Sequence, residues 1–168
     1  MSDVGLPQPD RFHAQAAVGW LELGSVLEAR RELDAISPAH REHPDVLEAW
    51  WPILAEEKNW NAALASAEKL VAQAPERQTG WVQQSYALHE LKRTGEACDR
   101  LVQVVEKFSD VYVIPYNLAC YQCQLGNKTE ALEWLRRAVQ ASDARTIRAM
   151  GMNDSDLAPL RDEIAKLA

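Results

Sequence analysis

Two cysteines, Cys120 and Cys123, form a CxxC pair, a spacing used in redox motifs and in many zinc sites. Both fall inside a segment with helical periodicity, without a second CxxC or a clustered pair of histidines nearby in the sequence. Zinc needs four well-placed ligands, or three and an open position, and even with His89 as a third ligand no fourth is visible. We therefore interpret both cysteines as small semi-apolar helix residues, and we expect neither a metal nor another cofactor.

The other residues that could act as acids, bases or nucleophiles are scattered along the sequence. His13, His40 and His43 form no ligand or nucleophile arrangement, and acid pairs such as Glu56–Glu57 are typical of exposed helix faces. The sequence contains no Gly-rich phosphate loop, no GxSxG and no HExxH motif. Because catalysis needs mutually placed groups in one pocket, the sequence predicts a protein that is not an enzyme.

The composition excludes several classes of partner. Among 168 residues, 25 acids outnumber 18 Lys and Arg, for a net charge of −7. Nucleic acid binding requires a basic face, so this balance argues against it. No apolar run reaches the roughly 18 residues that span a bilayer, so we expect no membrane partner. Three cysteines, an odd number, argue against a disulfide framework and favour a reducing compartment, and we predict a cytoplasmic location.

The elements that would position these residues repeat along the chain. Ala29, Ala63, Ala97 and Ala131 are spaced 34 residues apart, each in the second helix of a predicted pair. The first helices are expected over about 11–23, 45–58, 79–92 and 112–125, and the second over about 26–36, 61–74, 95–108 and 129–141. The predicted repeats 10–43, 44–77, 78–111 and 112–145 account for residues 11–142. They follow an N-terminal segment, 1–10, and precede a C-terminal part, 143–168, with a turn and a capping helix over about 155–168.

One stretch of the sequence resembles the repeat of a known family. The segment YNLACYQCQLGNKTEALEWLRRA, residues 116–138, resembles a tetratricopeptide repeat (TPR) in its Asn-Leu-Ala, Leu-Gly, Glu-Ala-Leu and final Ala. Trp81 with Ala97, and Pro75, fit the same frame in other copies, and the resemblance covers about residues 10–142. It implies an all-α, right-handed superhelical solenoid of about four TPR-like repeats with a concave groove lined by the first helices. Lys58 and Lys92 depart from the pattern, because they replace the turn glycine of repeats two and three.

The resemblance also implies which residues face the groove. The positions at which some TPR domains hold a chaperone's C-terminal carboxylate with Lys, Asn and Arg carry Ala14, Val18, Ala49, Val82 and Tyr86 here, so we do not expect that function. An extended or helical peptide with apolar anchors and some basic character suits the lining better. The expected lining residues are Arg11, Ala14, Gln15, Val18, Glu22, Asp45, Glu48, Ala49, Pro52, Glu56, Val82, Gln83, Tyr86, His89, Glu90, Tyr116, Asn117, Cys120, Cys123 and Gln124.

The predicted function is therefore a protein–protein interaction module that binds a partner's peptide segment in its groove. The residues predicted to contact the partner are Tyr86, His89, Tyr116, Asn117 and Cys120, with Glu48 and Glu56 setting the charge preference. Two alternatives stay open. One is a TPR chaperone of the small acidic type found in secretion systems. The other is a self-associating scaffold or homodimer, since the adjacent Trp50 and Trp51 point to different helix faces and one of them would be exposed.

Overall fold

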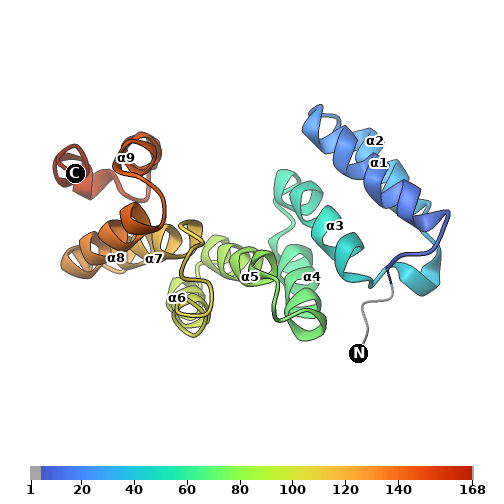
Figure 1. Ribbon diagram of the computed structural model, residues 1–168, viewed down its shortest axis with the longest axis horizontal. Helices are drawn as coiled ribbons and strands as arrows, with labels where there is room; N and C mark the ends of the chain where they lie inside the picture. The colour runs from blue at the N-terminus through green and yellow to red at the C-terminus, as the bar shows by residue number, and fades with distance from the viewer. Residues whose placement is uncertain (1–4, 168) are drawn as a thin grey trace. The chain divides into compact units, whose positions relative to one another are not determined.

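A computed structural model describes residues 5–167, so the first four residues of the predicted N-terminal segment and the last residue of the predicted capping helix lie outside it. All regular secondary structure in the described range is helical (Figure 1). The α-helices are α1 (Asp10–Glu22), α2 (Val26–Asp34), α3 (Pro44–Glu56), α4 (Trp60–Gln73), α5 (Gln78–Glu90), α6 (Thr94–Val102), α7 (Val113–Gln124), α8 (Lys128–Ala141), α9 (Ala144–Asn153) and α10 (Arg161–Ile164). Two short 3₁₀ helices, η1 (Pro38–His40) and η2 (Ala158–Leu160), complete the set.

The helices follow the 34-residue register of the sequence. The second helix of each pair begins at Val26, Trp60, Thr94 and Lys128, at intervals of 34 residues. The repeated alanine of each pair is fully buried where the two helices cross. A side chain larger than a methyl group would push these helices apart, which explains why the position is alanine in every repeat. The predicted all-α repeat architecture is confirmed. Its superhelical course remains a prediction.

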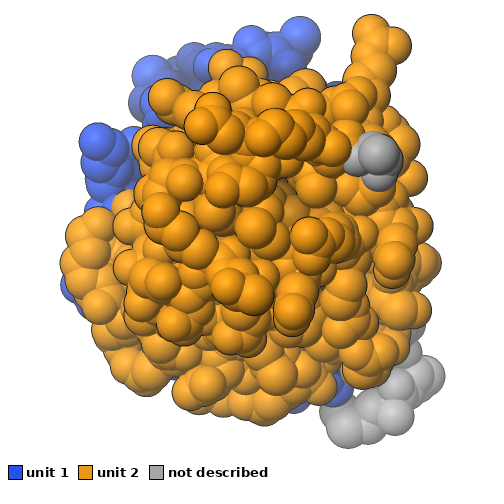
Figure 2. Space-filling view, turned by 90° about the vertical axis from the view of Figure 1, so that its left-hand side faces the viewer, with its two compact units in different colours: residues 1–83 blue, residues 84–168 orange. Residues whose placement is uncertain are grey.

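The chain divides into two compact units, residues 1–83 and 84–168 (Figure 2). The boundary lies inside α5. We describe each unit by itself. Unit 1 is built around α1–α4, and its core includes Ala17, Leu33 and Ile53, all essentially inaccessible to solvent. Leu6, in the segment that precedes α1, is 2% exposed and joins this core. The backbone before the first helix is thereby fixed to the first helix pair.

A buried carboxylate joins the two ends of the first repeat. Asp10, in the first turn of α1, is 3% exposed and accepts hydrogen bonds from the backbone N–H and the hydroxyl of Ser37. The Nδ1 atom of His40 lies 2.6 Å from the same carboxylate. These hydrogen bonds, chiefly the one from the Ser37 hydroxyl, lower the pKa of Asp10 from 3.8 to about 2. His40, in the loop between the first two helix pairs, is half-buried in this cluster.

Unit 2 contains α6–α10, and its buried side chains come from each of its longer helices. Leu101, Ile114, Leu118, Leu135 and Ile147 are all fully buried. Tyr121 on α7 is 2% exposed, and its hydroxyl lies 3.1 Å from the Ser85 hydroxyl. The helix α6 ends at Val102, six residues before the predicted end at residue 108. Three valines among the four residues 102–105 favour this early end, because β-branched side chains lose rotamer freedom in a helix.

The C-terminal part differs from the prediction of a turn over 143–151 and a helix over about 155–168. The long helix is α9, which starts directly after Asp143, whose carboxylate accepts a hydrogen bond from the Thr146 N–H at 2.9 Å. Gly151 then approaches Ile164 so closely that a Cβ atom would lie 3.2 Å from the Ile164 side chain. Pro159 interrupts the second half, which forms only η2 and α10. The placement of the capping helix was therefore wrong, although an all-helical cap on α8 is present.

The turn between the helices of each pair has the same backbone geometry. Gly24 and Gly126 have φ angles of 73° and 86°, and at the equivalent positions Lys58 and Lys92 have φ angles of 53° and 64°. Only glycine adopts this left-handed conformation without steric cost. Repeats two and three therefore carry strain at a position where repeats one and four carry none.

We expect Lys58→Gly to raise the free energy of unfolding by about 0.5–1 kcal/mol, because relief of the left-handed strain outweighs the added chain entropy of glycine. Gly126→Ala should lower it by about 1 kcal/mol, since no atom lies near the added Cβ and the φ angle alone sets the cost. Gly95→Ala, in helical backbone that is equally open, is the control and should be neutral or stabilising. Urea unfolding measures all three, and equal effects of the two alanine variants would contradict the interpretation.

Asp10 predicts a pH dependence of stability. Its pKa is lower in the folded chain than in the unfolded chain, so its contribution is present above pH 3.8 and is lost as the pH falls towards about 2. We expect Asp10→Asn to lower stability most near neutral pH, and the difference from the natural protein to shrink between about pH 4 and about pH 2. Urea unfolding at several pH values measures this, with the exposed Asp34→Asn as the control. A difference that does not change with pH would contradict the assignment.

Candidate functional site

In unit 1 a groove runs between α1 and α3. Two adjoining hollows, of about 560 and 600 Å³, share Val18 of α1 and Asp45 of α3 as lining residues. The hollow of about 560 Å³ is also lined by Gly5 and Leu6, which precede α1. Arg11 Nε donates a hydrogen bond to the Leu6 carbonyl at 3.0 Å. The remaining lining residues are Arg11, Ala14, Gln15, Leu21, Glu22, Glu48, Ala49 and Pro52.

The floor of this groove is apolar and its edges are acidic. Val18 is 46% exposed between the small residues Ala14 and Ala49, which leaves room for a side chain from outside. The Nη1 atom of Arg77 lies 2.7 Å from Asp45 Oδ1 and 2.9 Å from Glu48 Oε2. Arg77 therefore neutralises part of the acidic charge at one edge. The groove can accept aliphatic side chains along its floor and basic side chains at its acidic edges.

In unit 2 the predicted contact residues bind a segment of the same chain. We call residues 154–156, which follow α9, the C-terminal strap. Tyr116 donates a hydrogen bond from its hydroxyl to Asp154 Oδ2 at 2.8 Å, and the Cys120 Sγ lies 3.5 Å from the same oxygen. His89 Nε2 lies 3.0 Å from Asp156 Oδ2, while its Nδ1 lies 3.0 Å from the Thr94 hydroxyl. The polar atoms of these three residues are thus already used within the chain.

The strap forms one wall of a cavity of about 350 Å³. Burial raises the pKa of Tyr86, Tyr116 and Cys120, and Asp154 and Asp156 raise it further in each case. Because Glu90, Asp154 and Asp156 outnumber Lys92 in its lining, the cavity favours a positively charged group. Its lining consists of Tyr86, His89, Glu90, Lys92, Asn117, Cys120, Tyr121, Asp154, Ser155 and Asp156.

The predicted site residues accordingly fall into two groups. Tyr86, His89, Asn117 and Cys120 line one cavity in unit 2, but only Tyr86, at 38%, is well exposed. Tyr116, His89 and Cys120 are buried at 5–9% exposure, because they hold the strap. In unit 1, Glu48 lines the groove and Glu56 lies exposed at the end of α3. Asp154 and Asp156 were not among the predicted site residues, and nothing in their sequence surroundings indicated that they contact α5 and α7.

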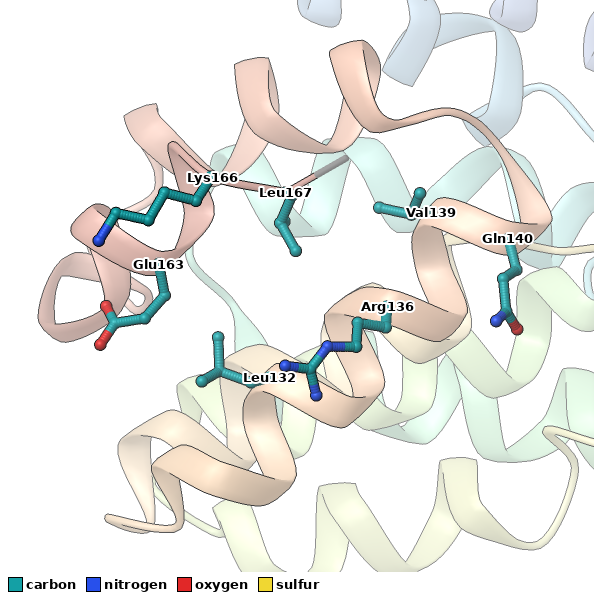
Figure 3. A pocket seen from close by; sticks show the side chains of 7 residues that line it. All are labelled: Leu132, Arg136, Val139, Gln140, Glu163, Lys166 and Leu167. Atoms are coloured by element: carbon teal, nitrogen blue, oxygen red, sulfur yellow. The ribbon is translucent and has the colours of Figure 1, made fainter.

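A further hollow of about 520 Å³ lies between α8 and the C-terminal residues. Figure 3 shows Leu132, Val139 and Leu167 directed into it, while Gln140 points away. Arg136, Glu163 and Lys166 complete the lining. Since these charges have both signs, the hollow defines no single ligand chemistry.

The cysteines show little chemical reactivity in this environment. All three are free and buried, and burial is the largest cause of a raised thiol pKa in each, to about 11 for Cys98. Their thiols are therefore protonated near neutral pH, and the thiolate is the form that reacts or binds a metal. Within residues 5–167, no three His, Cys, Asp or Glu side chains are grouped so that they could hold a metal ion. None of the described helices is long and apolar enough to cross a membrane.

No protein-family profile matches the sequence, and no curated protein is significantly similar to it. Solved structures are similar in fold. A TPR protein of Thermus thermophilus, TTC0263, is 20% identical, with a TM-score of 0.74 over 93% of this chain and 86% of that one. PilF of Pseudomonas aeruginosa is 18% identical, with a TM-score of 0.75 over 92% of this chain and 68% of its own. MamA of Desulfovibrio magneticus RS-1 is 17% identical, with a TM-score of 0.72 over 97% and 95%. The helix pairs, their 34-residue register and these likenesses together show that the chain has the all-α fold of tetratricopeptide repeats.

Proposed function

We propose that the protein is a non-catalytic interaction module, and that the groove between α1 and α3 binds a peptide segment of a partner protein. The observation that carries this proposal is the pair of adjoining hollows with a partly exposed valine on their shared wall. An extended strand or one face of a helix can place aliphatic side chains in both hollows. A cytoplasmic location would suit the free thiols.

The acidic residues at the edges of the groove indicate which side chains the bound peptide should carry. Glu22 lines the groove, and Glu56 lies one helical turn beyond the lining residue Pro52. A peptide that alternates aliphatic residues with Lys or Arg would therefore match both the floor and the edges. Because these charges are at the surface, its affinity should fall as the salt concentration rises.

In unit 2, considered by itself, a peptide segment of a partner would contact Tyr86 and Asn117 first. The negative cavity beside the strap suits a basic side chain of the bound segment. His89, Tyr116 and Cys120 act there by holding the strap that forms one wall, so their contribution to binding would be indirect. Glu48 would act through its ion pair with Arg77.

The groove is tested by selecting peptides from a random library displayed on phage against the purified protein. We expect the selected peptides to combine aliphatic residues with Lys or Arg. Their affinity, measured by fluorescence anisotropy, should fall at least about tenfold with Val18→Arg, since a central anchor is worth about 1–2 kcal/mol or more. Val102→Arg is the matched control, because Val102 is also 46% exposed but lies on α6 of unit 2 and does not line the groove. Selected peptides that bind Val18→Arg as tightly as the natural protein would exclude the groove.

The two roles of tyrosine in unit 2 can be separated. Tyr116→Phe removes a hydrogen bond to a carboxylate and should lower the free energy of unfolding by about 1–3 kcal/mol, with faster amide exchange over residues 152–157. Tyr86→Ala should lower the free energy of unfolding less, because the Tyr86 side chain is partly exposed. It should, however, lower the affinity of the protein for the selected peptides. Urea unfolding and hydrogen exchange measure the first effect, and anisotropy measures the second. Equal stability losses in the two variants would contradict the distinction.

A further inference from the structure

Aromatic side chains that the sequence predicted to be exposed are covered in both units. In unit 1 we expected Trp50 or Trp51 to be exposed, but both are half-buried, and Trp50 packs against the core of that unit. In unit 2 we expected Tyr116 to line an open groove, but it is 5% exposed. The group that Tyr116 binds belongs to the C-terminal strap, a segment that lies outside the helices.

The strap lies on α7 as an extended, acidic peptide. Tyr116 and Cys120 contact Asp154 Oδ2, and Gln124 Nε2 donates a hydrogen bond to the Asp156 carbonyl oxygen at 3.0 Å. Asp154 has extended backbone angles, with φ −86° and ψ 123°. Because Tyr116, Cys120 and Gln124 are four residues apart, they lie on one face of the helix. That face therefore binds both a side chain and the main chain of the strap.

This face of α7 corresponds to the groove of unit 1. The α1 residues at the same register, 102 residues or three repeats earlier, are Ala14, Val18 and Glu22. All three line the hollows between α1 and α3. The strap thus occupies, in the fourth repeat, the positions that line an open groove in the first repeat.

The strap also supplies most of the negative charge near this face. Asp154 and Asp156 are two of the three carboxylates in the lining of the 350 Å³ cavity, and the third, Glu90, is balanced by Lys92. Since a carboxylate can only accept hydrogen bonds, His89 Nε2 is the donor to Asp156. Without the strap, the face would present hydrogen-bond donors and balanced charge, which suit a segment that carries carboxylates.

The strap is attached in a way that allows it to open locally. Gly151 and Leu157, on either side of it, are buried, whereas Met152, Asn153 and Ser155 are exposed. The strap itself, Asp-Ser-Asp, has no apolar side chain. Segments with few buried apolar contacts open at lower free energy than the core to which they are attached. Opening of the strap therefore exchanges its hydrogen bonds for water while Leu157 stays packed.

We propose that the face formed by α5 and α7 is a second peptide site, specific for an extended acidic segment of a partner protein, and that the strap occupies it as a built-in competitor. The preferred segment has two aspartates separated by one residue, the spacing in the strap, where the Asp156 N–H donates to Asp154 Oδ1 at 2.9 Å. Because the strap is tethered, its effective concentration is about millimolar, and the site stays closed to weaker or dilute segments. This inference concerns unit 2 and goes beyond the function proposed for the groove of unit 1.

The strap sequence, offered as a separate peptide, tests the site. The probe is a fluorescein-labelled peptide of residues 151–160, and fluorescence anisotropy measures its binding. Asp154→Asn combined with Asp156→Asn weakens the competitor, so this variant should bind the probe at least about tenfold more tightly than the natural protein. Asp162→Asn combined with Glu163→Gln is the matched control, because it removes the same charge from exposed positions of α10. A probe with asparagine at both aspartate positions should bind neither protein.

Thiol alkylation measures the same exchange within the protein. Cys120, beside Asp154, is 5% exposed, and Cys98 on α6 is 6% exposed and accepts a hydrogen bond from Gln122. With N-ethylmaleimide and mass spectrometry, the double aspartate variant should modify Cys120 at least about tenfold faster than the natural protein and Cys98 at an unchanged rate. An excess of unlabelled peptide should slow the modification of Cys120 again.

Several results would overturn the proposal. They are equal affinity of the probe for the natural protein and the double variant, no binding up to about 1 mM, and alkylation of Cys120 that the peptide does not slow. If Cys98 also reacts faster, the double variant has loosened as a whole, and Gln124→Ala decides, since it removes only the hydrogen bond to the Asp156 carbonyl. Gln124→Ala should accelerate Cys120 alone, and equal acceleration of both cysteines would exclude a separate strap movement. Val18→Arg should leave all these results unchanged, so this proposal and the groove in unit 1 can fail independently.

Discussion

The close crossing of two helices at a buried alanine is the contact on which the rest of this fold depends. Each pair meets at Ala29, Ala63, Ala97 or Ala131, with no accessible surface left on the methyl group. At this separation the first helix presents one face to its partner, one to the neighbouring pair and one outward. The groove and the strap contacts are both consequences of how these remaining faces are filled.

The strap shows how a repeat surface can be completed by the chain itself. Two carboxylates from beyond α9 meet a phenol, an imidazole and a thiol from α5 and α7, and the buried donors are satisfied without a ligand. Among residues 5–167, no comparable segment covers the face between α1 and α3 over most of its length, apart from Gly5 and Leu6 at one end. The difference between the units explains why the site that we favour lies in unit 1, although the aromatic residues of unit 2 were the stronger signal in the sequence.

The features that were predictable from the sequence are those set by short-range rules. The helix pairs follow from the alanine spacing, and the turns follow from Gly24 and Gly126, with Lys58 and Lys92 adopting the same backbone. Most of the groove lining follows from the register alone. The strap was not predictable, because contact between Tyr116 and Asp154 depends on where α9 directs the chain. The capping helix was misplaced for a related reason: both Asp143 and Asp154 resemble N-caps, and the close packing of Gly151 against Ile164 decides between them.

The division into two units also has a consequence for how the chain acquires its structure during synthesis. All residues of the unit 1 core precede residue 84, so this unit can form while the remainder is still being made. Unit 2 needs Leu157, Leu160 and Ile164 to complete its interior, and these residues are synthesised only after all of its longer helices. Until then Tyr116 and His89 lack their carboxylate partners. The N-terminal half can therefore offer a finished binding groove before the C-terminal half has closed.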